Sequence, residues 1–136
     1  MIKIRKIKNN SMLPTLKNGD YVFTKKKQKV KRNQIVIFNF QNSLIIKRVV
    51  GIAQDHILIH EVKIYLNKCK TSTNYLNKLP ESNFTDFDDV TIPNHHVYVL
   101  GDNRRQSSKD SREIGTINQS IISEIVFLKI WPLKFL

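Results

Sequence analysis

The clearest secondary-structure signal in this chain is the run Leu44-Ile45-Ile46-Lys47-Arg48-Val49-Val50. Aliphatic and β-branched residues dominate it, and such residues favour pleated, half-buried strands. Because side chains alternate across a strand, Ile45, Lys47 and Val49 share one face. We therefore expect Lys47 to project between two β-branched neighbours, where burial would favour its uncharged amine. The alternative is an edge strand from which Lys47 reaches back to water.

Similar short segments, rich in Ile, Val, Leu and Tyr, recur along most of the chain and predict further strands. They lie at residues 1–8, 21–24, 35–38, 56–66 and 96–100. Residues 118–128 fit a short helix or a strand, because β-branched residues restrict a helix there. Residues 67–94 are polar and predict an irregular excursion with one or two short strands. The sequence therefore indicates an all-β fold.

Length and composition indicate one domain that spans residues 1–136. With 136 residues and 40% hydrophobic content, the chain can form one compact core but not two ordinary domains. No apolar run approaches the roughly 20 residues of a membrane-spanning helix, and the start lacks the apolar centre of a secretory signal. Cys69 is the sole cysteine, which excludes an internal disulfide.

Positive charge is concentrated in the first third of the sequence. Thirteen of the 23 Lys and Arg residues precede residue 49, where the only acid is Asp20, whereas the remainder carries ten of each sign. The basic run at residues 25–32 lies between two predicted strands and indicates a solvated loop or a contact with an anionic membrane surface. No specific nucleic acid is expected, because no base-reading motif accompanies the basic run.

Four motifs follow one another in a fixed order. They are Ser11-Met12-Leu13-Pro14-Thr15-Leu16, then Gly19-Asp20-Tyr21-Val22, then Lys47-Arg48-Val49-Val50-Gly51, and last Gly101-Asp102-Asn103-Arg104 running on to Ser108-Lys109-Asp110-Ser111-Arg112. In this order they resemble the signature boxes of the type I signal peptidases, the S26-type leader peptidases that use a Ser-Lys dyad. The resemblance implies coiled antiparallel β-sheets with a small barrel, the signal-peptidase and LexA-like catalytic fold.

By this resemblance Ser11 is the nucleophile and Lys47 the general base. A serine hydroxyl needs an adjacent base, and a lysine serves only when its amine is neutral. The implied activity is that of a serine endopeptidase that forms an acyl-enzyme and needs no cofactor. It would cleave N-terminal signal or leader sequences of precursor polypeptides after small residues, at Ala-x-Ala-like sites.

The resemblance also implies supporting residues, which are Asn9, Ser108, Asp110, Arg48 and Arg112. The Asn9 amide would donate to the oxyanion, or Asn9 would be a turn residue while the Ser11 backbone N–H serves. Ser108 would lie near the Lys47 amine, and Asp110 would pair with Arg48 and Arg112. The chain has one residue more than the family before this serine, so Ser107 is the alternative to Ser108.

Other sites and functions are weaker interpretations. The four histidines, His56, His60, His95 and His96, form no recognisable metal-ligand set or Ser-His-Asp triad, and we expect no metal. A LexA-like self-cleaving regulator would need a DNA-binding domain and a cleavable linker before Ser11. A non-catalytic basic β module that binds RNA or lipid is the remaining rival.

Localisation depends on what precedes Ser11. Family members usually carry a membrane anchor directly before the Ser-Met motif, and ten residues precede Ser11 here. Three explanations compete: a trimmed domain, an anchorless enzyme held on the membrane surface by its basic first third, or a soluble cytoplasmic relative that matures one specific precursor. We expect membrane association at the extracytoplasmic face, to which Trp131 and Phe135 could add interfacial anchoring.

Overall fold

The structure is a computed structural model that describes residues 1–61, 63–71 and 86–136. The strands of these residues form two antiparallel sheets, and their helices are short. The helices are α1 (Ser111–Ile114) and the 3₁₀ turns η2 (Arg104–Gln106) and η3 (Gln119–Ile121). The prediction of a mostly β, antiparallel fold is therefore confirmed.

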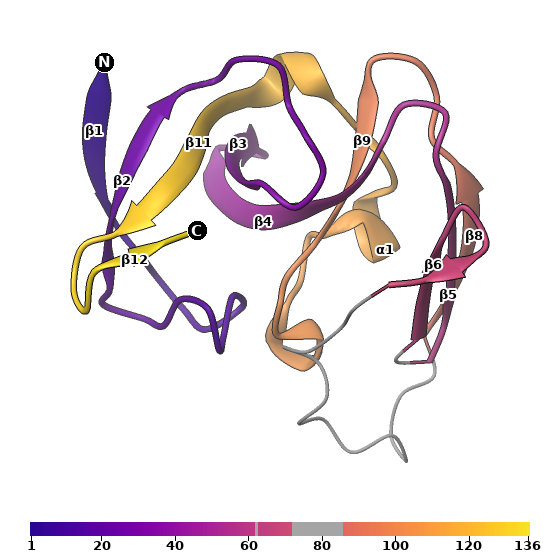
Figure 1. Cartoon of the computed structure of the whole chain (residues 1–136), viewed down its shortest axis with the longest axis horizontal. Coiled ribbons are helices and arrows are strands. Elements are labelled where there is room, and N and C mark those ends of the chain that lie inside the picture. The colour runs from indigo at the N-terminus through magenta and orange to yellow at the C-terminus, as the bar shows by residue number, and fades with distance from the viewer. Residues whose placement is uncertain (62, 72–85) are drawn as a thin grey trace.

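The larger sheet has eight strands in the order β1-β2-β11-β3-β4-β9-β10, and β12 pairs with β11. These strands are β1 (Ile2–Lys6), β2 (Tyr21–Lys26), β3 (Ile35–Phe40), β4 (Ser43–Ile52), β9 (His96–Leu100), β10 (Ile117–Asn118), β11 (Ile122–Lys129) and β12 (Lys134–Phe135). Figure 1 shows the sheet curling, with β4 passing through the middle of the molecule. No pairing among the described residues joins the β1 edge to the β10 edge, so a closed small barrel stays a prediction.

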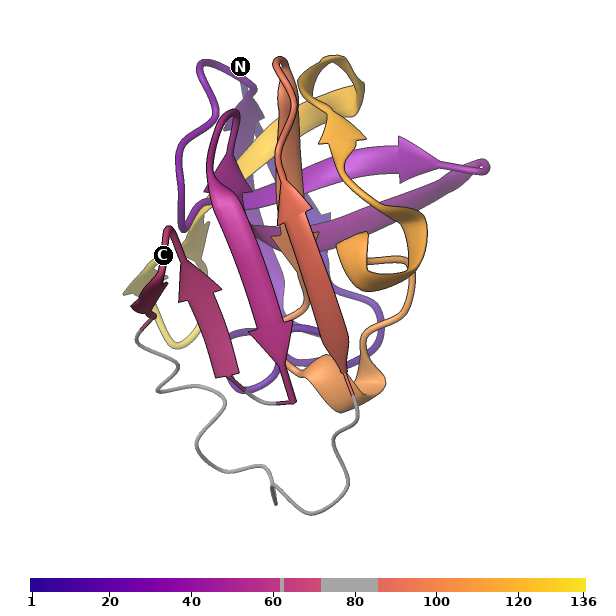
Figure 2. The same cartoon turned by 90° about the vertical axis from the view of Figure 1, so that its right-hand side faces the viewer.

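The smaller sheet has the order β7-β6-β5-β8 and lies on one side of the molecule, where Figure 2 shows it face-on. Its strands are β5 (His56–His60), β6 (Lys63–Leu66), β7 (Cys69–Lys70) and β8 (Phe87–Thr91). Strand β4 shifts register against β9 between Val49 and Gly51. A Cβ at Gly51 would lie 2.7 Å from the Ile92 side chain, so a glycine here lets the two sheets approach closely.

A hydrophobic cluster fixes the loop that follows β1. Met12 and Leu16 are fully buried against Val22, Ile35 and Val126 of the larger sheet. Burial of each large apolar side chain contributes about 1.5 to 3 kcal/mol. Met12 and Leu16 of the Ser-Met motif therefore anchor this loop, which also carries Ser11.

Two parts of the sequence form structures more specific than expected. The basic run begins inside β2, and its loop is held by a bidentate pair between Arg32 and Asp55, so the loop is more than a solvated tip. Residues 118–128 include the last residue of β10, then η3 and most of β11, so this segment is mainly a strand. The polar excursion contains β7 and β8, while its part at residues 72–85 lies outside the described residues.

Candidate active site

Ser11 lies in the loop between β1 and β2 and is buried. Its carbonyl oxygen accepts a hydrogen bond of 2.8 Å from the backbone N–H of Asn103. The Asn103 side chain donates to the carbonyl oxygen of Asn10 at 3.0 Å. Two motifs far apart in the sequence therefore meet here, and the last one fixes the backbone around Ser11.

Lys47 is buried in β4, with only 3% of its surface exposed. It lies opposite Val36 of β3, and its Nζ donates a hydrogen bond of 2.9 Å to Ser107 Oγ. Burial lowers the pKa of the Lys47 amine from 10.5 to about 8, although the charge of Asp110 opposes this shift. The prediction that Lys47 is buried is confirmed. Because its pKa is lowered, a larger fraction of the amine is uncharged near neutral pH than in an exposed lysine.

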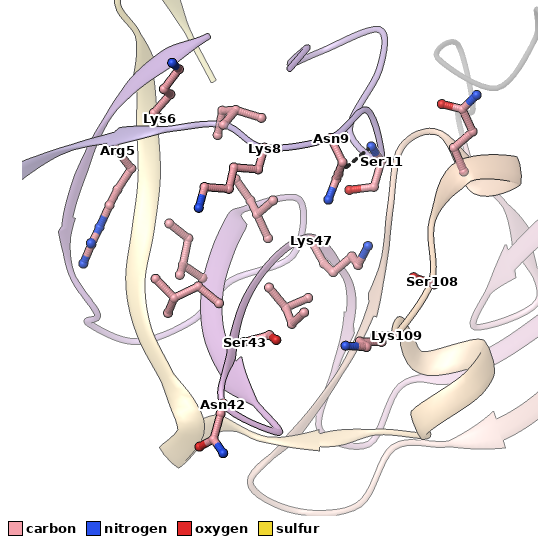
Figure 3. A pocket seen from close by; sticks show the side chains of 16 residues that line it. Arg5, Lys6, Lys8, Asn9, Ser11, Asn42, Ser43, Lys47, Ser108 and Lys109 are labelled. Carbon is pink, nitrogen blue, oxygen red and sulfur yellow. Dashed lines mark hydrogen bonds between the residues drawn. The ribbon is translucent and has the colours of Figure 1, made fainter. Parts of the chain in front are cut away.

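Ser11 and Lys47 line the same cavity, which has a volume of about 610 Å³. Figure 3 shows the Lys47 side chain extending from β4 with its amine toward Ser11. The aliphatic part of the lining is formed by Ile7, Ile37, Leu44, Ile45 and Ile46. A hydroxyl and a buried amine with a lowered pKa therefore line one cavity, part of whose wall is aliphatic.

The serine that contacts Lys47 is Ser107, whereas the sequence analysis favoured Ser108. Ser107 Oγ accepts from Lys47 and donates to Asp110 Oδ2 at 2.7 Å. Ser108 is exposed and lines the cavity. The chain after Gly101 forms η2 before it reaches Ser107, so the extra residue falls between Ser107 and Asp110. Ser107 thereby fixes the direction of the Lys47 amine.

Arg48 pairs with a different carboxylate from the one expected. Its guanidinium makes two hydrogen bonds of 2.8 Å to Asp102, not to Asp110 as the resemblance implied. Asp102 also accepts from Thr15 Oγ1 at 2.6 Å. The reason is geometric, because Lys47 and Arg48 project from opposite faces of β4. Asp102 thus connects β4 to the loop that carries Ser11.

Arg112 does pair with Asp110, as expected, at 2.7 Å. It also contacts Asp86, which bridges Arg112 at 2.6 Å and Arg104 at 2.9 Å. Asp110 is almost fully buried, and it accepts hydrogen bonds from both Arg112 and Ser107. The sequence analysis missed Asp86 because it lies outside every motif.

Asn9 binds the backbone of Ser11 through its side-chain oxygen, not through its amide group. It adopts a positive φ of 63°, and its Oδ1 accepts from the Ser11 N–H at 3.1 Å. Its own N–H donates to Asn18 Oδ1 at 2.8 Å. Asn9 is therefore a turn residue here. An oxyanion that accepted from the Ser11 N–H would have to displace Asn9 Oδ1 from this hydrogen bond.

Gly101 is a further residue on which the site depends. A Cβ at this position would lie 2.5 Å from Ser107 Cβ and 2.7 Å from the carbonyl oxygen of Ser11, and it would overlap Ser107 Oγ. Real Cβ atoms do not approach other atoms so closely, so only glycine lets the two serines pack around this corner. Its membership of the last motif was the signal that could have identified it.

The family model described as signal peptidase, peptidase S26, matches residues 1–131. The chain belongs to this family. It is 30% identical to signal peptidase I of Bacillus amyloliquefaciens over 128 residues, which cover 86% of this chain and 69% of that protein. It is 32% identical to signal peptidase IB of Staphylococcus aureus strain Mu50 over 146 residues, which cover 93% of this chain and 76% of that protein.

A crystal structure of a signal peptidase I from Enterococcus faecalis V583 has a similar fold. The TM-score is 0.57 at 26% identity, and the match covers 70% of this chain and 94% of that chain. This signal peptidase is therefore a serine endopeptidase whose substrates carry signal peptides. Among its described residues, no helix combines the length and the hydrophobicity needed to cross a membrane.

Proposed function

We propose that this signal peptidase cleaves its substrates with a Ser11–Lys47 dyad through an acyl-enzyme. The observation that carries the proposal is the burial of Lys47 in a cavity that Ser11 also lines, because burial gives the amine a pKa of about 8. A lysine on the surface would remain protonated at neutral pH and could not accept a proton. Within this site, the buried amine of Lys47 is the base placed to activate Ser11.

The reaction follows from these positions. Neutral Lys47 takes the proton of the Ser11 hydroxyl as Oγ attacks the scissile carbonyl carbon. The oxyanion is stabilised by the Ser11 N–H, which Asn9 releases, and the protonated amine then gives its proton to the leaving nitrogen. Neutral Lys47 next deprotonates a water that attacks the ester carbon, and proton return to Ser11 Oγ restores the enzyme. In each step, the hydrogen bond to Ser107 fixes the orientation of the Lys47 amine.

The substrate would bind as an extended strand along β4. Strand β9 pairs with β4 only from Arg48 onward, so residues 44–46 have no strand partner on that side among the described residues. A peptide can add to such an edge through its backbone, while pockets select alternate side chains. The isoleucines that line the cavity at this edge provide shallow apolar walls, which suit small side chains of the Ala-x-Ala type.

The assay for this function uses short precursor peptides with an Ala-x-Ala site, incubated with the enzyme in detergent or lipid. Mass spectrometry of the products should locate a single cut after the second Ala. Peptides with Leu in place of that Ala should stay intact. Cleavage at unrelated positions, or equal cleavage of the Leu peptides, would contradict the proposed specificity.

We further propose that the enzyme works on an anionic membrane surface, at the extracytoplasmic face. The support is a set of exposed apolar side chains on β1 and around β12, two strands that lie on the same side of the molecule in Figure 1. Trp131 and Phe135 are 82% and 79% exposed, and Ile2 and Ile4 are exposed on β1. Lys6 is exposed and shares the strand face of Ile2 and Ile4, which suits contact with acyl chains and anionic headgroups.

Binding to vesicles tests the membrane proposal. Vesicles that contain anionic phospholipid should retain the protein at about 0.05 M salt and release most of it at about 0.5 M, because salt screens the lysines. Replacing Trp131 and Phe135 together by Ser should weaken the binding, whereas Phe87→Ser, at an exposed site of β8, should not. Absent or salt-independent binding would favour a soluble cytoplasmic enzyme that matures one specific precursor.

A further inference from the structure

The walls of the active-site cavity carry an unbalanced positive charge. Its charged lining residues are Arg5, Lys6, Lys8, Lys47 and Lys109, and none of the described residues that line it is acidic. Three of these cations are already engaged within the protein. Arg5 forms a bidentate pair with Glu124, Lys6 lies over the ring of Tyr21, and Lys47 donates to Ser107.

The other two, Lys8 and Lys109, have no side-chain partner among the described residues. Lys8 is exposed, lies two residues after the end of β1 and directly before Asn9, and lines the cavity on the side of the Ser11 loop. Lys109 comes from the opposite wall, in the segment that follows Ser107. In Figure 3, Lys8 lies to the left of Lys47 and Lys109 lies below it. A ligand in the cavity would therefore pass between two available ammonium groups.

Lys109 owes its position to the extra residue of this chain. Ser107 and Asp110, which bind each other, are separated by two residues, and the backbone at Lys109 takes the left-handed conformation with φ of 57°. Glu113 holds this conformation, because its Oε2 accepts from the Lys109 N–H at 2.7 Å. A non-glycine residue in this region is uncommon. The extra residue therefore places Ser108 and Lys109 in the lining of the cavity.

We propose that Lys109, together with Lys8, selects precursors that carry an Asp or Glu side chain close to the scissile bond. This inference rests on the proposed function and adds a second requirement to the small residues at the cleavage site. A carboxylate close to the two amines would be attracted by both, in a cavity that no described acidic side chain lines. A basic side chain at the same position would be repelled by both.

A peptide scan tests this selection. Asp, Asn or Lys is placed in turn at each position near the Ala-x-Ala site, and kcat/KM is measured for each peptide. At the preferred position, Asp should exceed Asn by about three- to tenfold, and Lys should fall below Asn. The advantage of Asp should shrink as salt rises. Lys109→Glu should reverse the order of Asp and Lys, whereas Lys63→Glu, an equal charge change on β6, should leave it unchanged.

Binding separates this inference from the proposed chemistry. The Ser11→Ala variant cannot form an acyl-enzyme, so its affinity for the same peptides, measured by fluorescence anisotropy, reports selection alone. Tighter binding of the Asp peptide than of the Lys peptide, lost in Ser11→Ala/Lys109→Glu, supports the inference even if the wild type cleaves none of the peptides. Equal affinities for the Asp, Asn and Lys peptides overturn it, even if the wild type cleaves them all.

Discussion

Ser11→Ala and Lys47→Met should each lower kcat for an Ala-x-Ala precursor peptide by about 10³- to 10⁴-fold. Ala removes the attacking oxygen, and Met keeps the length and apolar character of the lysine stem but removes the base. Because the two groups act in one step, the double variant should be no slower than either single variant. The measurement is the rate of product formation, followed by chromatography at enzyme concentrations high enough to detect the residual activity.

The two neighbouring serines supply a matched control for this prediction. Ser107→Ala removes the hydrogen bond that aims the Lys47 amine and should reduce kcat by about 10- to 100-fold. Ser108→Ala removes an exposed hydroxyl and should change kcat less than about threefold. An equal loss in both variants would contradict the assignment of Ser107 as the partner of Lys47. Full activity of Lys47→Met would contradict the dyad itself.

Gly101→Ala adds a single methyl group and should strongly reduce both the activity and the stability of the enzyme. The new Cβ would overlap Ser107 and the Ser11 carbonyl, so both the base and the nucleophile must shift. Displacement of reacting groups by about 1 Å can cost on the order of 10²-fold in rate. Overpacking at such a corner should also lower the free energy of unfolding by about 1 to 3 kcal/mol. Kinetics and denaturant unfolding measure the two effects.

Gly115→Ala is the control for this change. Gly115 follows α1, has a positive φ of 77°, and has no atom within 4 Å of the position that a Cβ would take. Its substitution should cost about 1 kcal/mol in unfolding free energy through backbone strain and should leave kcat close to that of the wild type. Wild-type activity in Gly101→Ala, or an equal loss of activity in both variants, would refute the role given to Gly101.

The burial of Lys47 did not follow from periodicity alone, because a lysine on an edge strand fits the same pattern. The periodicity was sufficient to predict the strands and the face of β4 on which Lys47 lies. Both depend on the alternation of side chains along β4, which is a local property. The same alternation already indicated that Lys47 and Arg48 face opposite ways. A carboxylate beside Lys47, such as Asp110, is thus poorly placed for Arg48, and the pairing with Asp102 follows from this geometry.

The corner from Gly101 to Asp110 could not be predicted in the same way. The choice between Ser107 and Ser108 depends on where the extra residue is accommodated, and that is decided by η2 and by the left-handed backbone at Lys109. Neither leaves a periodic signal in the sequence. Asp86, which contacts Arg104 and Arg112, lies next to residues outside the described part and belongs to no motif.

The dependence of kcat/KM on pH tests most directly whether Lys47 acts as a neutral base. Its pKa is lowered from 10.5 to about 8 by burial, so the amine is protonated and inactive below this value and neutral above it. With a peptide that has no titrating group, kcat/KM should rise about tenfold per pH unit between about pH 6 and pH 8 and then level off. A profile that is flat across this range, or that rises only near the ordinary lysine pKa, would contradict the account.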